Sequence, residues 1–193
     1  METPPAITDS VVRLQQRIGC TDSPVYVRVS PVKFATFNEC HPNVIAHVKT
    51  HGGDAVPGWC VWESQELIEG VFHSVWRSPA GELIDITPHR DEEKRILFIP
   101  DNRHAPDGTP VENIRVCLVD TAETRHTIRL NEALFALRVK YPDGMNVGRF
   151  LDTVSAATMD TDGCPCGSLH PFAVCHKSAG ASEQYRAWRH LIG

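Results

Sequence analysis

The chain has 193 residues, 41% of them hydrophobic, which is enough for one ordinary domain with at most a small appendage. It carries 19 Lys and Arg against 24 Asp and Glu, a formal net charge of −5. That balance argues against a nucleic-acid clamp, because phosphate binding relies on dense basic surfaces. No apolar run approaches the roughly 18–20 residues that a membrane span needs.

The N-terminus and the cysteine content indicate the cellular compartment. Residues 1–5 contain no basic segment that leads into an apolar one, so no secretory signal is predicted. There are 7 cysteines, an odd number, and three of them lie within 164–175. A secreted disulfide scaffold tends to have an even number in a shorter chain. We therefore expect metal ligands and free thiols in a soluble, cytoplasmic protein without nucleic-acid or membrane partners.

The first 120 residues predict two helices among several short strands. Residues 8–10 precede an amphipathic run that ends at Gly19, as in a capped helix with glycine just beyond its last turn. A second helix is predicted over 38–49, where Pro42 fits only the first turn. Cys40 therefore lies at a helix N-terminus. The β-rich runs are 25–29, 58–62, 70–77, 82–87, 96–99 and 111–119.

The last third of the chain contains two further helical patterns, over 130–141 and 147–158. Asp-Thr-Asp-Gly at 160–163 interrupts the second pattern, and we place a domain boundary there. The predicted organisation is a main α+β domain, 1–160, and a C-terminal module, 161–193.

Cys40, His73 and Asp85 form a candidate catalytic group. A thiol at a helix N-terminus lies at the positive end of the helix dipole, beside free N–H groups that favour the thiolate. The same N–H groups can hydrogen-bond an oxyanion formed by attack on a carbonyl. His73 lies within one predicted strand and Asp85 within the next, where a buried carboxylate needs a partner.

The turn between these two strands decides whether His73 and Asp85 can meet. If the hairpin loop has an odd length, for example 78–80, Arg77 pairs with Gly81 and His73 faces Asp85 on one side of the sheet. A two-residue loop would place the two side chains on opposite faces. With an odd loop, Asp85 can orient His73 and stabilise its imidazolium.

The motifs around these residues resemble the transglutaminase-like core of the papain-like superfamily. They are Cys40 at a helix start, Gly-Trp-Cys-Val-Trp at 58–62, His-Ser-Val-Trp at 73–76, and Leu-Ile-Asp-Ile-Thr-Pro at 83–88. The resemblance covers about residues 38–100. It implies an antiparallel sheet with N-terminal helices, Cys40 as nucleophile, His73 as general base and then acid, and Asp85 as the orienting carboxylate.

Several of these residues also have plainer interpretations. Cys40 alone is typical of an inert buried thiol, and His73 alone of a hydrogen-bonded strand histidine. His41 and His47 compete for the role of base, but we expect both on the solvated side of the helix or at its cap. Asn38 is interpreted as the helix cap. The tryptophans at 59, 62 and 76 are expected in the core, although one lining the cleft would suit an acyl substrate.

The C-terminal module contains four metal-ligand residues in the pattern Cys-x-Cys, eight residues, Cys-His: Cys164, Cys166, Cys175 and His176. Three thiolates and one imidazole are the closed tetrahedral set that structural zinc prefers, and soft sulfur disfavours magnesium and calcium. His170 is a possible substitute ligand. Such a short segment has little core of its own, so one zinc ion per chain would supply its folding energy. A closing helix over 185–191 is expected to pack Trp188 and Leu191 inward.

This segment also resembles the SEC-C motif, on the strength of Cys-Pro-Cys-Gly-Ser at 164–168, the aromatic Phe172, and the Cys-His pair. The resemblance implies a structural Zn²⁺ on Cys164, Cys166, Cys175 and His176. It further implies docking to a protein partner through the zinc module.

Together these patterns predict a cysteine-dependent amide hydrolase or acyltransferase that acts on a protein or peptide substrate. Two alternatives remain open. One is a non-enzymatic adaptor in which an inactive core presents the zinc module to a partner. The other is a metallohydrolase that uses His73, Asp85 and His89, which lack a compact ligand motif in the sequence.

Overall fold

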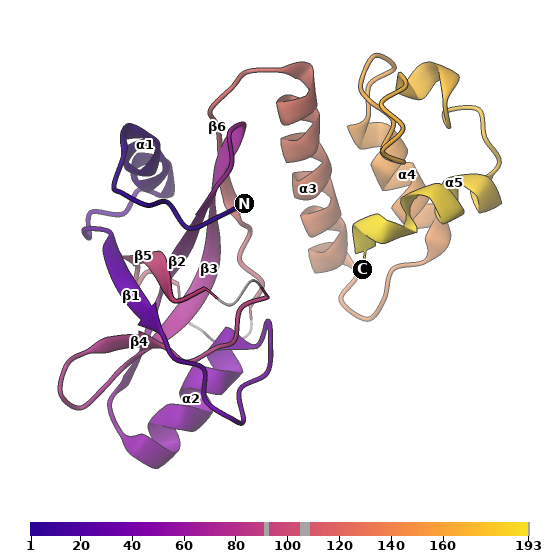
Figure 1. Ribbon diagram of the computed structural model, residues 1–193. Coiled ribbons are helices and arrows are strands. Elements are labelled where there is room, and N and C mark those ends of the chain that lie inside the picture. Colours follow the sequence, from indigo (N-terminus) through magenta and orange to yellow (C-terminus); the bar gives the residue numbers. More distant parts are fainter. Residues whose placement is uncertain (91–92, 105–108, 193) are drawn as a thin grey trace. The chain divides into compact units, whose positions relative to one another are not determined.

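The computed structural model describes residues 1–90, 93–104 and 109–192 (Figure 1). It divides into two compact units, residues 1–118 and 119–193. Within the described residues, the first unit combines two helices with six strands, and the second is helical. The α+β class is therefore confirmed.

Five strands of the first unit close into a small barrel. The strand order β2-β5-β1-β4-β3 returns to β2, and β6 is added to the outer edge of β3. All neighbours are antiparallel except β1 and β4, which are parallel, so the predicted antiparallel sheet is wrong at that one pair. The strands are β1 (Val25–Val29), β2 (Asp54–Glu63), β3 (Leu67–Arg77), β4 (Leu83–Asp85), β5 (Arg95–Pro100) and β6 (Ile114–Cys117).

Apolar side chains fill the barrel and also cover its outside. The interior cluster takes residues from every strand of the ring: Val27, Val56, Cys60, Val75, Leu83, Ile96 and Phe98. Helix α1 (Asp9–Ile18) covers the outer face with Val11 and Leu14, which pack with Trp59 of β2. Neighbouring residues of β2 thus face opposite sides and are both buried, which explains its nearly continuous apolar sequence. Gly19 ends α1 in the left-handed conformation at φ 75°, as predicted.

Helix α2 (Cys40–His51) begins at the candidate nucleophile and packs beside β3 and β2. Its Val44 is buried against Ile84 and Ile86, which lie on either side of Asp85 at the end of β4. The helix ends at Gly52, whose carbonyl accepts a hydrogen bond of 2.9 Å from the Trp76 indole nitrogen. Both ends of α2 are therefore held against the strands that carry His73 and Asp85.

The second unit is formed by α3 (Ala122–Lys140), α4 (Val147–Ala157), α5 (Ala181–Trp188) and two short 3₁₀ helices, Phe172–Val174 and Arg189–Ile192. One cluster joins them: Leu130, Leu134, Leu137, Phe150, Leu151, Val154, Cys164, Phe172 and Trp188. Because α3 and α4 bury their apolar faces against the cysteine-rich segment, the compact unit that contains this segment begins at Val119, and the predicted boundary at 160/161 falls inside that unit. Trp188 is fully buried, as predicted.

The longest helix, α3, has 19 residues and intersperses Arg, Glu and Lys among its leucines. No helix in the described ranges combines the length and the apolar character needed to cross a lipid bilayer. Helix α3 begins at Ala122, eight residues before the start of the predicted helix 130–141. The Thr121 hydroxyl caps it by accepting a hydrogen bond from the Thr124 amide at 3.1 Å.

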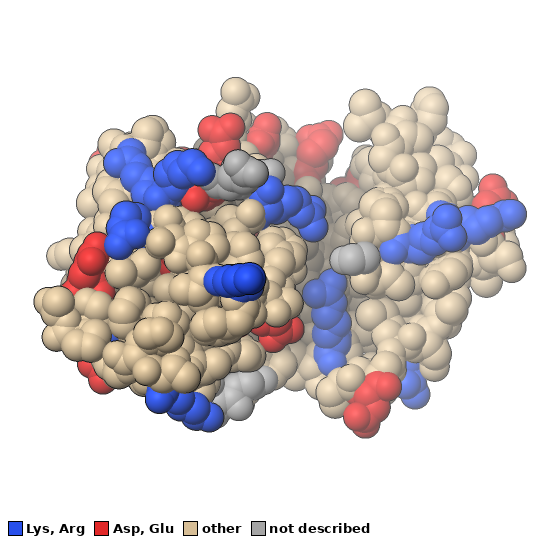
Figure 2. Space-filling view, turned by 60° about the horizontal axis from the view of Figure 1, so that its bottom comes forward, with Lys and Arg blue, Asp and Glu red and all other residues tan. Residues whose placement is uncertain are grey.

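Charged side chains of both signs share the surface. On the face seen in Figure 2, Lys and Arg side chains lie among Asp and Glu side chains with uncharged surface between them. The ion pairs of the chain include exposed Arg28 with Glu82 at 3.2 Å, and Arg129 with the buried Asp162 at 2.6 Å. The expectation that nucleic acid is not a partner stays a prediction.

Candidate active site and candidate metal centre

Cys40 is the first residue of α2, and it is buried, with 9% of the residue exposed. At the start of the helix the Asn43 amide donates to the Glu39 carbonyl at 2.9 Å, and Pro42 has no N–H. The amides of Cys40 and His41 therefore precede the intrahelical bonds and belong to the group of free N–H donors at a helix start. This confirms the predicted position of Cys40 at a helix N-terminus.

Asn43 fixes the approach to this helix. Its side-chain amide donates to the Thr36 carbonyl at 2.8 Å, and its oxygen accepts from the Thr36 amide at 3.0 Å. The same amide also lies 3.3 Å from the Thr87 hydroxyl, beyond the end of β4. Asn38 does not cap the helix as predicted. It adopts φ 63°, a left-handed turn that asparagine tolerates, and Glu39 occupies the cap position.

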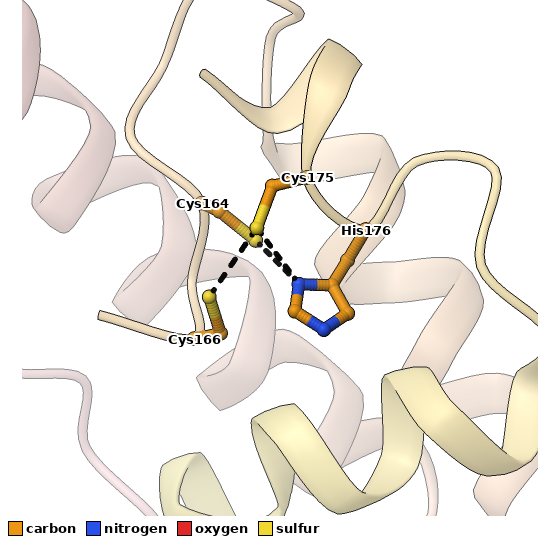
Figure 3. A group of neighbouring side chains, drawn as sticks. All are labelled: Cys164, Cys166, Cys175 and His176. Atoms are coloured by element: carbon orange, nitrogen blue, oxygen red, sulfur yellow. Dashed lines mark hydrogen bonds between the residues drawn. The ribbon is translucent and has the colours of Figure 1, made fainter. Parts of the chain in front are cut away.

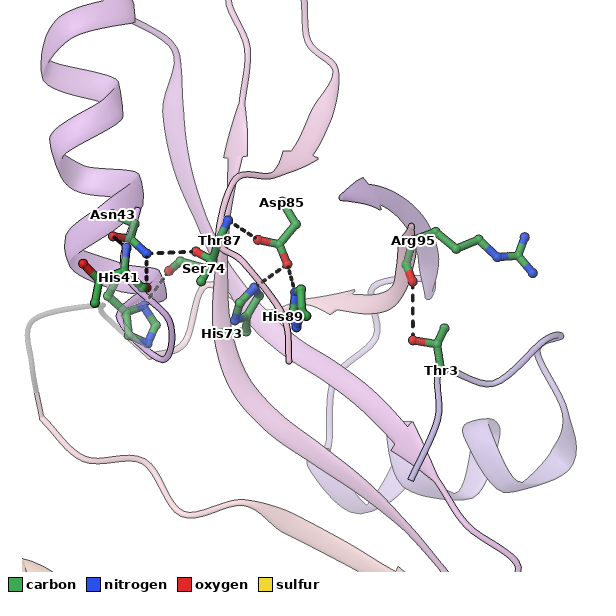
Figure 4. A network of polar contacts seen from close by, with 10 residues as sticks. Thr3, His41, Asn43, His73, Ser74, Asp85, Thr87, His89 and Arg95 are labelled. Atoms are coloured by element: carbon green, nitrogen blue, oxygen red, sulfur yellow. Dashed lines mark hydrogen bonds and ion pairs between the residues drawn. The ribbon is translucent and has the colours of Figure 1, made fainter. Parts of the chain in front are cut away.

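His73 and Asp85 meet at one end of the barrel (Figure 4). The His73 Nε2 atom lies 2.8 Å from Asp85 Oδ2, and both residues are buried. The predicted pairing of Arg77 with Gly81 is wrong, since Arg77 pairs with Leu83 and Trp76 with Ile84. The register differs by two residues, which preserves the face of every side chain. The loop, 78–82, has an odd length, which is the alternative that allows His73 and Asp85 to meet, and the contact is diagonal instead of directly opposed.

Asp85 has two further partners, which are also drawn in Figure 4. Its Oδ1 accepts from the Thr87 amide at 2.9 Å, and its Oδ2 lies 2.7 Å from His89 Nε2. Burial by itself would raise the pKa of Asp85, but the charge and hydrogen bonds of His73 and His89 outweigh it and hold the pKa well below its usual range. Asp85 is therefore an anion at every physiological pH.

Cys40 and His73 both line a cavity of about 500 Å³. Its wall is largely apolar, and His89 and Arg90 add polar groups. The apolar part includes Phe37, Trp62, Val71 and Phe72. Trp62 is thus the tryptophan that lines the cleft, whereas Trp59 is buried in the core.

The electrostatics of the cavity favour an ion pair. Burial would raise the pKa of the Cys40 thiol, but hydrogen bonds to the side chains of His41 and His73 outweigh it and lower the pKa to about 5. Burial would lower the pKa of His73, but the Asp85 carboxylate and the Cys40 sulfur raise it to about 10. Because Asp85 holds the Nε2 atom of His73, Nδ1 is the ring nitrogen left for the sulfur. At neutral pH the pair is a thiolate beside an imidazolium.

His41 and His47 do not lie on a solvated face, so that prediction is wrong. The Nδ1 atom of His41 lies 2.6 Å from the Ser74 hydroxyl, and its ring centroid lies 5.0 Å from that of Phe72. His47 is buried and stacks edge-on against Trp76, with centroids 4.5 Å apart. The reason is helical period: the buried residues of α2 are Cys40, Asn43, Val44 and His47, which form one stripe facing the barrel.

The second unit brings together the four residues predicted to bind metal (Figure 3). The ligand atoms of Cys164, Cys166, Cys175 and His176 all lie within 4.8 Å of one another. His176 Nδ1 is 3.3 Å from Cys164 Sγ and 3.1 Å from Cys175 Sγ, and the sulfurs of Cys166 and Cys175 are 3.7 Å apart. A zinc tetrahedron with bonds near 2.3 Å has sulfur–sulfur edges of about 3.8 Å. His170, the alternative ligand, is exposed and outside this group.

The surroundings of this group fit a metal bound by thiolates. The Ser168 hydroxyl lies 3.2 Å from Cys166 Sγ and 3.3 Å from Cys175 Sγ, where it can donate to a thiolate. The indole nitrogen of Trp188 is buried and forms no regular hydrogen bond with the described groups. It does interact with the Cys164 sulfur, toward which its N–H is available as a donor. Donors that contact the sulfur ligands, and not the metal itself, stabilise metal-bound thiolates. The group is therefore compatible with a bound metal.

Comparison with protein-family models, with curated proteins and with solved structures finds no match to this chain. The resemblances to the transglutaminase-like core and to the SEC-C motif therefore stay predictions.

Sequence reasoning underestimated His89 and missed the roles of Asn43, Thr87 and Ser74. The sequence indicates His89 only as a possible metal ligand in a loop after Pro88, whereas in the structure it contacts the same carboxylate oxygen as His73. The signal available was its spacing of four residues from Asp85. Nothing in the sequence indicates a role for Ser74, because a serine within a strand is common and its partner, His41, is distant in the sequence.

Proposed function

We propose that the first unit is a cysteine-dependent amide hydrolase, with transfer of the acyl group to an amine as the related reaction. One observation carries this proposal: Cys40, at the head of α2, shares a cavity with His73, whose other ring nitrogen bonds to the buried Asp85 at 2.8 Å. A nucleophile, a base and a group that orients the base are the parts that acyl transfer needs.

In this reaction the Cys40 thiolate attacks the carbonyl carbon of an amide, which forms a C–S bond and an oxyanion. The free N–H groups at the start of α2 are the donors for that oxyanion. The intermediate collapses, the C–N bond breaks, and the departing amine takes a proton from the His73 imidazolium. A thioester and a neutral imidazole remain.

The second half of the cycle returns the site to its starting state. His73 accepts a proton from water, whose oxygen attacks the thioester carbon. The C–S bond then breaks, which releases a carboxylic acid and restores the Cys40 thiolate beside the His73 imidazolium. Asp85 stays ionised throughout and holds the ring in place through Nε2. The apolar wall of the cavity suits a peptide or protein substrate with an apolar side chain near the scissile bond.

We also propose that Cys164, Cys166, Cys175 and His176 hold one structural Zn²⁺ per chain. The ion would supply a cross-link that joins the segment between α4 and α5 and would take no part in catalysis. Leu169 is 88% exposed and Val174 is 78% exposed in this segment, which favours its use as a contact site for a protein partner. The alternative function, a non-enzymatic adaptor, would use this same cysteine-rich segment to bind its partner.

The proposal is tested by substitution of Cys40. The Cys40→Ala variant is expected to lose hydrolysis of fluorogenic peptide amides and to lose labelling by iodoacetamide at pH 6, at which an ordinary thiol is protonated. The Cys20→Ser variant is the matched control, because Cys20 is a half-buried thiol that contacts the Pro100 carbonyl at 3.0 Å. If mass mapping shows Cys40 labelled no faster than Cys20, Cys60 or Cys117, the nucleophile assignment is wrong.

A further inference from the structure

His73, Asp85 and His89 form a second group of metal-ligand atoms, separate from the cysteine-rich one. One ligand atom from each of the three side chains lies within 4.8 Å of the other two. The two histidines approach the same carboxylate oxygen, at 2.8 Å and 2.7 Å. The carboxylate is fixed behind them, since its other oxygen accepts from the Thr87 amide at 2.9 Å.

This donor set matches a divalent transition ion. Two imidazoles and one carboxylate are a common set for zinc and for non-haem iron, whereas magnesium and calcium prefer oxygen alone. Ligand atoms at about 2.0–2.2 Å from a tetrahedral ion lie about 3.4 Å apart. The present contacts would therefore need to open by about 0.6 Å. Small side-chain rotations supply that distance, and His89 is the outermost of the three, with a side chain 13% exposed.

The group also has access to solvent and room for further ligands. His73 and His89 both line the cavity that contains Cys40, so an ion held by the three side chains has its remaining coordination positions directed toward that cavity. The centroid of the His89 ring lies 5.8 Å from that of His73 and 5.7 Å from that of Trp62. An entry path and a carboxylate that is itself hydrogen-bonded, here by the Thr87 amide, are two of the features expected of a metal site.

We propose that His73, Asp85 and His89 bind a divalent transition ion such as Zn²⁺, and that this ion switches off the thiol chemistry of the cavity. The ion occupies Nε2 of His73 and separates the ring from Asp85. The proton of a neutral, metal-bound imidazole is then confined to Nδ1, the ring nitrogen that Asp85 does not hold. In that form His73 has no free nitrogen with which to accept a proton from water, so the thioester is not hydrolysed.

The inhibitory consequence rests on the proposed function, but the binding of the ion does not. The experiment starts from the full chain loaded with one equivalent of Zn²⁺, which fills the cysteine-rich group first. Further Zn²⁺ is then titrated by calorimetry, with elemental analysis of the product, and hydrolysis of a fluorogenic peptide amide is followed in parallel. We expect a second ion per chain and a loss of hydrolysis of tenfold or more as that ion binds.

Variants locate the second ion. His89→Gln is expected to weaken its binding at least tenfold, since an amide is a poor substitute for imidazole nitrogen. His51→Gln is the control, because His51 is an exposed histidine at the end of α2. Binding of only one ion per chain would overturn the inference, as would a second ion that His89→Gln leaves unchanged.

The outcomes separate this inference from the proposed function. If the second ion raises hydrolysis, and Cys40→Ala retains it, the metal site stands and the thiol mechanism fails in favour of a metallohydrolase. If the second ion binds and no hydrolysis is found with or without it, the site also stands while the proposed function fails. If hydrolysis depends on Cys40 and a second ion does not bind, only the metal inference is overturned.

Discussion

At the scale of single residues, the reactivity of Cys40 depends on two imidazoles that reach it from different elements. His73 comes from β3, and its ring is held by Asp85. His41 follows Cys40 on α2, and its ring is held by the Ser74 hydroxyl at 2.6 Å. Adjacent residues of α2 thus interact with adjacent residues of β3. Both histidines oppose the effect of burial on the Cys40 pKa.

The contribution of His41 can be measured by the pH dependence of alkylation. Because the thiolate reacts and the thiol does not, the rate for Cys40 should be constant above its pKa of about 5 and fall below it. The double variant His41→Leu with Ser74→Ala removes one hydrogen bond to the sulfur without leaving a buried hydroxyl unpaired, so the pKa should rise. We expect alkylation by iodoacetamide at pH 6 to slow about tenfold.

His51→Gln, farther along the same helix, should leave the alkylation profile where it is. A double variant with an unchanged midpoint would show that His73 alone sets the state of the thiol.

At the scale of elements, the end of α2 must pass very close to β3 for Cys40 to reach the barrel at its other end. Gly53 permits this approach. It has φ 79°, and a Cβ atom placed on it would lie 2.1 Å from the Arg77 carbonyl oxygen and 2.9 Å from the Trp76 indole nitrogen. Only glycine fits both the backbone angle and the space.

A pair of glycine substitutions separates the two effects. Gly81, in the β3–β4 loop, also has a positive φ, 89°, but its Cβ would meet no atom within 4 Å among the described residues. Gly81→Ala should therefore lower the free energy of unfolding by only about 1–2 kcal/mol, the cost of the left-handed angle. Gly53→Ala should cost at least about 2 kcal/mol more, because backbone must also move.

Urea denaturation of both variants measures this difference. Equal costs at the two positions would mean that the close approach of α2 to β3 does not constrain the fold.

At the scale of the whole molecule, the two units have separate cores and carry separate candidate sites. The barrel unit contains Cys40, His73 and Asp85, and the helical unit contains the cysteine-rich group. The side chains of that group pack directly on the helical core, since Cys164 is one of its buried residues. Loss of a metal should therefore affect the helical unit far more than the barrel.

Chelation tests this independence. A strong chelator should lower the helical signal in far-ultraviolet circular dichroism and expose Trp188 to solvent, because the four ligands tie the segment between α4 and α5 together next to the helical core. Rapid alkylation of Cys40 at pH 6 should persist under the same conditions, since the described residues that line its cavity all belong to the barrel unit. Loss of both signals together would show that the barrel depends on the metal.

Local patterns in the sequence were sufficient for the elements and for the composition of both sites. Gly19 predicted the end of α1, and the Cys-x-Cys and Cys-His spacing predicted a metal-ligand group that the fold brings together. These features depend on neighbours a few residues apart, whose relative positions follow from helix, strand and turn geometry. The same is true of the shared face of His73 and Asp85, which required only an odd loop length.

Tertiary structure alone decided the partners that come from distant elements. The pairing of His41 with Ser74, the contact of Asn43 with Thr87 and the assignment of α3 and α4 to the helical unit depend on how separate elements pack. Local sequence specifies which side chains an element carries. Which of several similar apolar faces pack against one another depends on the packing of the whole chain. The sequence therefore determined the chemical groups of each site, and the fold decided their contacts.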